Sequence, residues 1–396
     1  MAVIKSNGLV KKLKRRCGES GNRRLFILFF TPSPFRRFTD SAIFASGVFY
    51  FAVLLFMILP FNAMAEEYVS TDINYYKFDG LTVIKPMITL NKDLSLNTSI
   101  LLRATLDNVE TQTTTVDAVS GATKTTTTTS NTKDEDNRKN LTFGITHAIS
   151  LYKIDAGYDY SREKDYTSQT PSIQLSRDFF ERNTTLAIGY SHNFDNVLGK
   201  YMSKAQDKDS NNYSISLTQF ISPITVAQIG YTYSHATGYL GTGNRKIALS
   251  GGGESYEYLP DSRKRDEIGV RLAQYITPIN SAVHLIYRWY RDDWWIKSNT
   301  YGIQYYQYVG ENTYVRLEYR YYAQDKAYFY KDSYAGSEQF ITSSNLYSEL
   351  HSHLYGVKLV HYLKSPNIST EVKYERYRQS TGLDGDIFMF GVKYHF

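Results

Sequence analysis

The stretch from Asp386 to Phe396 reads DIFMFGVKYHF and repeats an apolar side chain at every second position. Residues two apart share one face of a β-strand. An exposed apolar strand invites aggregation in a soluble protein. In an outer-membrane barrel, the same face meets lipid while the strand pairs with the first one. We therefore interpret this stretch as the closing strand of a membrane barrel, with a buried strand of a soluble sandwich as the alternative.

The apolar face of this strand also resembles the C-terminal signal that the bacterial barrel-assembly machinery reads, which favours a terminal Phe. The positions that carry the resemblance are Phe388, Phe390, Val392, Tyr394 and Phe396. The resemblance implies that the assembly machinery is a partner of the chain and that its destination is the outer membrane of a Gram-negative bacterium.

Residues 1–65 have the pattern of a secretory signal peptide. Ten Lys and Arg residues precede an apolar run from Ser41 to Phe61, and small residues follow at Ala63 and Ala65, the two positions that a signal peptidase reads. We expect cleavage before Glu66, which leaves residues 66–396 as one barrel domain. An uncleaved anchor is the alternative, because the run approaches the ~20 residues that span a bilayer.

The leader changes the meaning of the net charge. The whole chain has 45 Lys and Arg against 39 Asp and Glu, a net charge of +6. Ten of the basic and two of the acidic residues precede residue 66. Residues 66–396 therefore have 35 basic and 37 acidic residues, a net charge of −2. Basicity is therefore no argument for nucleic-acid binding. The only cysteine, Cys17, lies in the leader too, which excludes disulfides from the mature chain.

Segments of about ten residues with period-two alternation continue through the rest of the chain, as transmembrane strands require. Between Thr313 and Ala323, for example, apolar or aromatic residues alternate with charged ones. Charged side chains in register cannot face lipid, so we expect them to line the lumen. The predicted lumen charges are Arg316, Glu318, Arg320, Lys358, Glu371, Lys373 and Glu375.

Short and long connections alternate between these segments, as they do in bacterial barrels. The pattern predicts an all-β transmembrane antiparallel β-barrel of about 16 strands. The predicted short turns lie near Asn91–Asp93, Ser150, Phe180–Arg182, Ser222-Pro223, Thr277–Asn280, Gly310-Glu311 and Lys364–Asn367. The predicted long connections lie near Asp107–Arg138, Asp195–Asn211, His235–Ser262 and Asp325–Glu349.

Three tryptophans, Trp289, Trp294 and Trp295, are clustered beside one connection together with Tyr287 and Tyr290. Aromatic residues are enriched where a membrane protein crosses the lipid–water interface. We expect these residues in the interfacial girdle, with an aromatic binding site as the alternative.

Several stretches resemble a bacterial family known only as domain of unknown function thirty-five seventy. They are SREKDYTSQTPSIQLSRDF from Ser161, RNTTLAIGYSH from Arg182, YLPDSRKR from Tyr258, RWYRDDWWIKSNT from Arg288 and DAVSGAT from Asp117. The resemblance covers nearly the whole mature chain. It implies an outer-membrane barrel and supplies no established activity.

The DAVSGAT segment is also similar to the target motif of the periplasmic FAD:protein FMN transferase. That resemblance implies that the Thr123 hydroxyl attacks the FAD pyrophosphate and becomes a phosphoester of FMN, with Mg²⁺ assisting. Asp117 and Ser120 would then be recognition residues, while Gly121 and Ala122 leave room for the enzyme. A small-residue turn is the alternative meaning of the segment. An external position of this loop conflicts with a periplasmic transferase unless modification precedes barrel insertion or the loop folds into the lumen.

Function is less constrained than fold, because one fold hosts many functions. A pore-like barrel is the first hypothesis, a carrier of covalently bound FMN the second, and a structural or adhesive surface barrel the third. No nucleophile motif or metal-ligand spacing is present, so we expect neither an enzyme nor a metal site.

Overall fold

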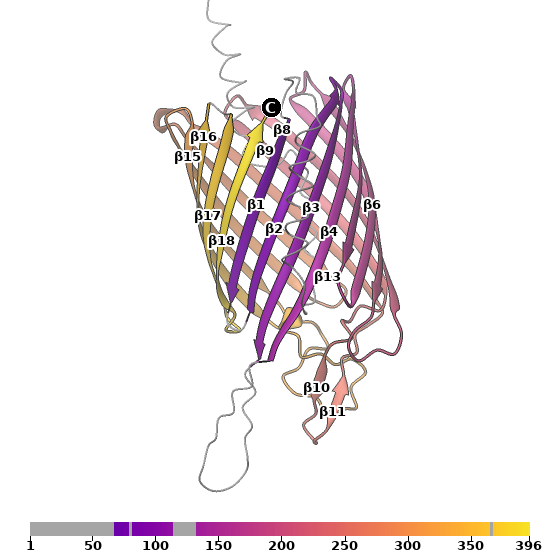
Figure 1. Cartoon of the computed structure of the whole chain (residues 1–396). Helices are drawn as coiled ribbons and strands as arrows, with labels where there is room; N and C mark the ends of the chain where they lie inside the picture. Colours follow the sequence, from indigo (N-terminus) through magenta and orange to yellow (C-terminus); the bar gives the residue numbers. More distant parts are fainter. Residues whose placement is uncertain (1–66, 79–80, 114–131, 365–366) are drawn as a thin grey trace, which may run out of the picture.

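Sixteen strands close into a barrel in the computed structural model, which describes residues 67–78, 81–113, 132–364 and 367–396 (Figure 1). The first strand, β1 (Tyr68–Phe78), pairs antiparallel with the last, β18 (Asp384–His395). Each other strand of the wall pairs with the next one in chain order. The expected antiparallel barrel of about 16 strands is therefore confirmed, and its closing pair is the one that the terminal alternation predicts.

The other barrel strands slope across the wall (Figure 1) and are β2 (Leu81–Ser95), β3 (Thr98–Thr113), β4 (Thr132–Ile149), β5 (Tyr152–Arg162), β6 (Tyr166–Phe179), β7 (Thr184–Val197), β8 (Gln206–Ser222), β9 (Thr225–Gly238), β12 (Ser262–Ile276), β13 (Ser281–Asp292), β14 (Lys297–Val309), β15 (Thr313–Gln324), β16 (Leu350–Leu363) and β17 (Ile368–Gln379). The short strands β10 (Lys246–Ala248) and β11 (Glu254–Tyr256) form a separate hairpin. Two 3-10 turns, η1 (Thr277–Ile279) and η2 (Asn345–Tyr347), lie in connections.

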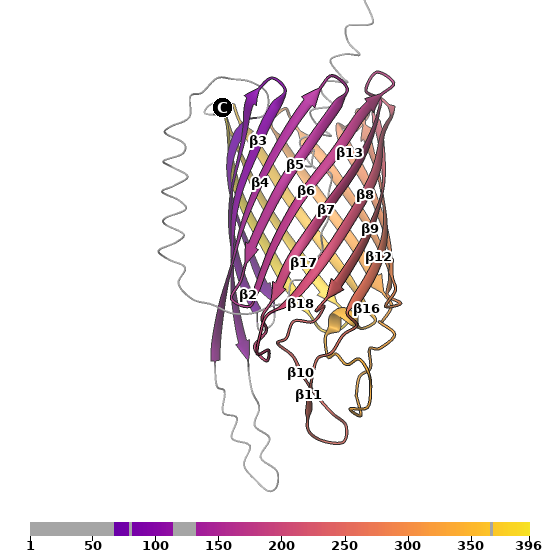
Figure 2. The same cartoon turned by 90° about the vertical axis from the view of Figure 1, so that its right-hand side faces the viewer.

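The two ends of the barrel differ in the length of their connections (Figure 2). Short turns such as 150–151 and 223–224 lie at the end where the chain terminates, and the β10–β11 hairpin extends from the opposite end. In bacterial barrels the short turns are periplasmic and the long connections external. The chain thus ends on the periplasmic side, and its long connections face outward.

An apolar band surrounds the barrel. Phe143, Ile173, Ile229, Leu317 and Phe390, which lie on five strands around the wall, are 44% to 54% exposed. Soluble proteins rarely expose a continuous apolar surface of this extent. The band identifies the protein as an integral barrel of the outer membrane. No helix in the described part of the chain is long and apolar enough to cross a bilayer.

The predicted turn at Asn91–Asp93 is wrong. Strand β2 continues to Ser95, with a register shift beside Asp93, and the turn lies at 96–97. The reason is bonding to a residue that precedes β1: Lys92 Nζ lies 2.7 Å from Glu67 Oε2, and the Asp93 N–H donates to Glu67 Oε1 at 3.2 Å. Because Lys92 and Asp93 bond to Glu67, strand β2 continues past them, and the chain reverses only after Ser95.

The predicted loop at Asp195–Asn211 is also too long. Strands β7 and β8 continue to Val197 and from Gln206, which leaves residues 198–205 as the connection. Lys208 Nζ lies 2.9 Å from Asp195 Oδ2, so a cross-strand ion pair holds residues whose polarity alone indicates a loop.

The lipid-facing assignment predicts an asymmetric response to charge. Leu317→Arg, on the exposed face, should lower the free energy of unfolding by about 2–4 kcal/mol, because it places a cation in the apolar band. The matched control is Thr232→Arg, which faces the lumen on β9 and should change the free energy by less than half as much. Urea unfolding of barrels refolded into phospholipid vesicles measures both values. Equal losses in the two variants would contradict the assignment.

Candidate functional site: the lumen wall and the external loop cap

Small uncharged polar side chains line most of the inward faces of β6 to β9, which also carry the Asp195–Lys208 ion pair near the external end. Ser191 is 1% exposed and pairs in register with Asn212, whose Nδ2 donates to Ser191 Oγ at 3.3 Å. The neighbours on the opposite face, such as Ile188, are exposed to lipid. We call this surface the neutral wall; its residues are Ser172, Gln174, Ser176, Gly189, Ser191, Asn193, Ser210, Asn212, Ser214, Ser216, Gln228, Gly230, Thr232 and Ser234.

Strands β15 to β17 carry the charged residues that the sequence places in the lumen. They lie on the face opposite Leu317 and Val357, which are exposed on the outside. Six of the seven form ion pairs within the described residues: Arg316 with Glu318 at 2.9 Å, Lys373 with Glu375 at 3.0 Å, and Lys358 with Glu371. The seventh, Arg320, has no carboxylate within ion-pair distance among those residues.

A glycine leaves room for two of these carboxylates. Glu318, Gly356 and Glu375 lie side by side on three strands. A Cβ at Gly356 would lie 3.1 Å from Glu375 Cγ and 3.4 Å from Glu318 Cβ, closer than most such contacts. The missing side chain thus lets both glutamates lean over β16 toward the row of basic residues beside them.

A second set of inward charges lies on β12, β13 and β15. Three carboxylates, Glu267, Asp292 and Glu318, lie among six arginines. We call these arginines the arginine stripe; they are Arg263, Arg265, Arg271, Arg288, Arg316 and Arg320. Of these six, only Arg316 and Arg320 belong to the lumen charges predicted from the sequence. Arg271 follows the same alternation between Val270 and Leu272, but Arg263 and Arg265 lie in the unbroken charged run 263–267, whose inward face the sequence pattern does not indicate.

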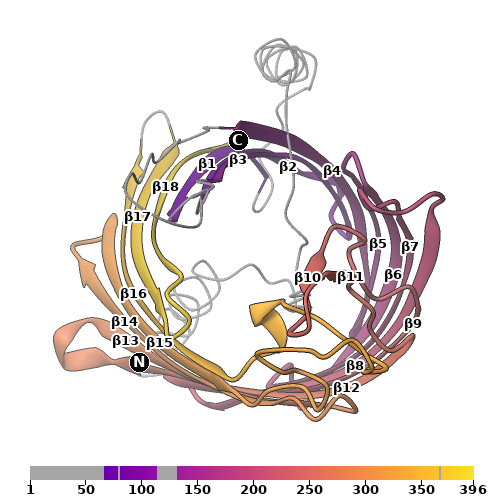
Figure 3. The ribbon, with the colours of Figure 1, turned by 90° about the horizontal axis from the view of Figure 1, so that it is seen from below.

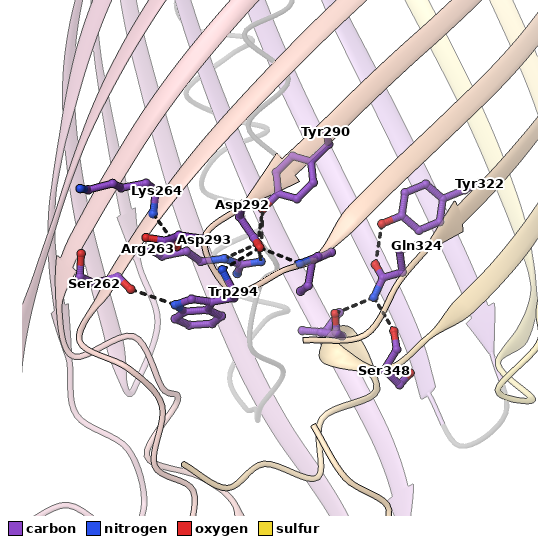
Figure 4. A network of polar contacts seen from close by, with 12 residues as sticks. Ser262, Arg263, Lys264, Tyr290, Asp292, Asp293, Trp294, Tyr322, Gln324 and Ser348 are labelled. Atoms are coloured by element: carbon purple, nitrogen blue, oxygen red, sulfur yellow. Dashed lines mark hydrogen bonds and ion pairs between the residues drawn. The ribbon is translucent and has the colours of Figure 1, made fainter. Parts of the chain in front are cut away.

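Among the three carboxylates beside the arginine stripe, Asp292 accepts the most hydrogen bonds (Figure 4). Its Oδ2 accepts hydrogen bonds from Arg263 Nη2 at 2.5 Å and from the Tyr290 hydroxyl at 2.8 Å. Its Oδ1 accepts the backbone N–H groups of Trp294 and Ile296 at 3.0 and 2.9 Å. Both oxygens are therefore occupied, and Asp292 fixes the β13–β14 turn to the wall.

Three external connections pack together into one unit, which we call the loop cap: residues 239–261, 293–296 and 325–349. Its apolar centre contains Leu259, Trp294, Phe329 and Tyr347, all buried. Viewed from the external end, the β10–β11 hairpin and the 325–349 segment cover the side of the mouth near β8, β9 and β12 (Figure 3). The side near β17, β18 and β1 lies away from them.

Backbone and side-chain hydrogen bonds join the two long connections of the cap. Tyr258 and Ile341 exchange N–H to O bonds of 3.0 and 2.9 Å. The Thr342 hydroxyl donates to Glu257 Oε1 at 2.6 Å, and both side chains are buried. Buried polar groups that are fully paired favour one arrangement over others. The cap is therefore a folded structure with its own small core.

The cap also contains groups whose pKa values are displaced. Hydrogen bonds from the backbone N–H of Ala335 and from Lys331 Nζ lower the pKa of Glu338 to about 2. Burial in the apolar centre of the cap raises the pKa of Tyr347. At neutral pH, Glu338 is thus ionised and accepts both donors, and Tyr347 is neutral.

The expected girdle position is wrong for Trp294. Its side chain is 2% exposed, its Nε1–H donates to the Ser262 carbonyl at 2.9 Å, and its ring lies 4.4 Å from the Arg263 guanidinium. Trp295, the next residue, is 70% exposed and packs on the Tyr328 ring. The two rings separate because the turn gives Trp295 a positive φ of 71°.

The remaining predicted site lies outside the described residues. Asp117, Ser120, Gly121, Ala122 and Thr123 belong to the connection between β3 and β4 at residues 114–131. Residues 1–66, with the predicted signal peptide, lie outside as well. In the described ranges, no group of three or more His, Cys, Asp or Glu residues has an arrangement that could hold a metal ion.

Solved barrels resemble this fold at low sequence identity. OccAB4 of Acinetobacter baumannii is 12% identical, with 83% of this chain and 96% of that chain covered and a TM-score of 0.42. The outer membrane protein OpdK of Pseudomonas aeruginosa is 8% identical, with 83% and 97% covered and a TM-score of 0.43. The siderophore receptor PirA of Pseudomonas aeruginosa is 9% identical, with 83% and 62% covered and a TM-score of 0.43. Similarity at this level carries no inference about function.

No curated protein matches the sequence. The family model described as protein of unknown function, DUF3570, matches residues 59–391. That match spans all the described barrel strands up to the middle of β18. The chain belongs to the DUF3570 family of outer-membrane β-barrels.

Proposed function

We propose that this barrel is a water-filled pore through the outer membrane, with an external mouth narrowed by the loop cap. The observation that carries the proposal is the polar lining: small neutral groups on β6–β9 adjoin the charged residues of β12–β17 around the lumen. A barrel of about 16 strands is wide enough to leave an aqueous channel when nothing plugs it.

The construction of the cap supports a narrowed mouth. Its two long connections start from β9 and β15 and end at β12 and β16, so its attachment points are confined to one arc of the wall. Trp294 anchors it there, between Arg263 and Phe329. Solutes would enter beside the cap, on the side of β17, β18 and β1 (Figure 3).

Removal of the anchor should widen the mouth. Trp294→Ala deletes a buried ring, a change that typically costs about 3–5 kcal/mol locally, and should release the cap. In planar bilayers we expect a higher mean single-channel conductance than for the unmodified protein. The matched control is Trp295→Ala, which removes the same side chain from an exposed position and should leave conductance unchanged.

A gel shift on heating shows that each variant is folded before the bilayer measurement. Folded barrels that give no current steps, in the unmodified protein and in Trp294→Ala alike, would contradict the pore. They would favour a structural or adhesive role for the external connections.

We also propose that the barrel-assembly machinery recognises the final strand. Phe388 and Phe390 are exposed on the lipid face, and the Phe396 N–H donates to the Glu67 carbonyl at 3.2 Å across the closing seam. Deletion of Phe396 should lower the heat-modifiable, membrane-inserted fraction several-fold in cells. Refolding of the purified variant into detergent should proceed normally, because the deletion removes contacts only at the end of the seam, among them one backbone hydrogen bond and the ring contacts with Tyr394 and Lys92. Normal insertion in cells would contradict the recognition.

The DAVSGAT motif favours a second role, as a carrier of covalently bound FMN. We propose Thr123 as the acceptor: its hydroxyl would form a phosphoester with FMN while the FAD pyrophosphate bond breaks and AMP leaves. Strand β3 ends at Thr113 and β4 begins at Thr132, both at the external end of the barrel. Modification by the periplasmic transferase would therefore precede insertion.

Intact-mass measurement tests the flavin directly. Protein from a host that contains FAD:protein FMN transferase should carry one FMN-sized mass increment, and Thr123→Ala should lose it. Thr115→Ala, in the same connection but outside the motif, should keep it. An unmodified mass for the unaltered protein would count against the carrier role.

A further inference from the structure

We propose that the arginine stripe binds and conducts small oxyanions, meaning solutes with carboxylate or phosphate groups. This inference rests on the proposed pore and specifies its substrate class. The stripe extends from Arg263, beneath the loop cap, along β12 and β13 to Arg316, near the periplasmic end of β15. Solutes that enter beside the cap would therefore meet guanidinium groups along most of the depth of the wall.

The carboxylates of these strands neutralise only half of the stripe. Asp292 bonds Arg263, Glu267 bonds Arg288, and Glu318 bonds Arg316. No further carboxylate faces the lumen from β12 to β15 in the described residues. The other three guanidinium groups, those of Arg265, Arg271 and Arg320, therefore keep an uncompensated positive charge.

Arg265 lies beside a carboxylate that is already saturated. It is in register with Asp292 on one side and with Ser234 on the other. Asp292 accepts bonds from Arg263, Tyr290 and two backbone N–H groups, so it has no position left for Arg265. The Nε–H of Arg265 is buried and without a hydrogen-bond partner. An unpaired buried donor is unfavourable, and an oxyanion in the lumen would satisfy it.

Arg271 and Arg320 belong to one cross-strand row with Ile286 and Gly302 between them. The Nη2 of Arg271 donates to His284 Nδ1 at 2.9 Å, a neutral acceptor, and its Nε–H is buried and unpaired. Arg320 is flanked by Gly302 and Leu354, which offer no charge. Neither arginine has a carboxylate within ion-pair distance in the described ranges.

The wall leaves room for a solute between these groups. Gly269 lies on the inward face of β12 between Arg265 and Arg271, and a Cβ built there would meet no atom within 4 Å. Gly230 lies beside it on β9. Strand rise of about 3.3 Å per residue places Arg265 about 20 Å from Arg271 along β12, so the stripe is a series of binding positions rather than one chelating site.

Guanidinium groups fit this role chemically. Each presents parallel N–H donors that match both oxygens of a carboxylate or phosphate. A lysine carries the same charge but lacks the parallel pair of N–H donors. An Arg-to-Lys substitution therefore separates charge attraction from bidentate hydrogen bonding. The series would also attract anions into the mouth, because a lumen wall of one sign raises the local concentration of the opposite ion.

The test is the ion selectivity of the pore in a planar bilayer. With a tenfold gradient of KCl, the zero-current potential of the unmodified protein should indicate preference for chloride over potassium. Millimolar citrate or inorganic phosphate should reduce the chloride current several-fold. The variant Arg265→Gln/Arg271→Gln/Arg320→Gln should shift the potential toward cation preference and lose the block by both probes.

Two control sets make the result specific. Arg162→Gln/Arg378→Gln removes exposed arginines from the outer surface and should keep both the selectivity and the block. Arg320→Lys should keep the selectivity and weaken the block, because charge remains while the parallel pair of N–H donors is lost. Block by citrate and phosphate alike indicates a general oxyanion path, and block by one probe assigns the path to carboxylates or to phosphates.

Different results would contradict the pore and the arginine path through it. Folded protein without any current contradicts the pore itself. A conducting barrel that prefers cations, or a triple variant that keeps its anion preference and its block, overturns the arginine path and leaves the pore intact. The heat-induced gel shift of each variant establishes that the altered barrels are folded.

Discussion

The structure depends on closure of the sheet. Inside a bilayer, every backbone N–H and C=O group needs a partner within the protein, because lipid offers none. The eleven matched residue pairs between β1 and β18 meet this requirement at the seam. Once the sheet is closed, period-two alternation decides the rest, because each strand must present one face to lipid and one to the lumen.

This constraint explains why the barrel is predictable from the sequence and why some details are not. The alternation around Leu317 and along β18 identifies strands, faces and closure. The turn at Asn91–Asp93 was predicted wrongly because Lys92 and Asp93 are polar for another reason, their bonds to Glu67. A residue 25 positions away cannot be anticipated from local pattern, since the contact exists only after closure.

The external mouth is the least predictable part of the described structure. Trp294 and Trp295 are adjacent and chemically identical, yet one is the centre of a buried cluster and the other is exposed. Their difference arises from the Asp292 hydrogen bonds and the positive φ at Trp295. Neither feature has a sequence signature that would distinguish a buried tryptophan from one in the interfacial girdle. Among the arginines of β12, Arg271 follows the alternation that identified Arg316, whereas Arg263 and Arg265 lie in a continuous charged run, 263–267, that does not indicate a face.

The contrast between the neutral wall and the arginine stripe has a consequence for any molecule inside the barrel. The net positive charge of the stripe lies on β12 to β15, and the adjoining arc from β6 to β9 carries mostly dipolar but uncharged groups. The electric field therefore has a component that points across the channel as well as along it. A solute with one ionised end experiences a torque in such a field, so it travels with a preferred rotational alignment instead of tumbling freely.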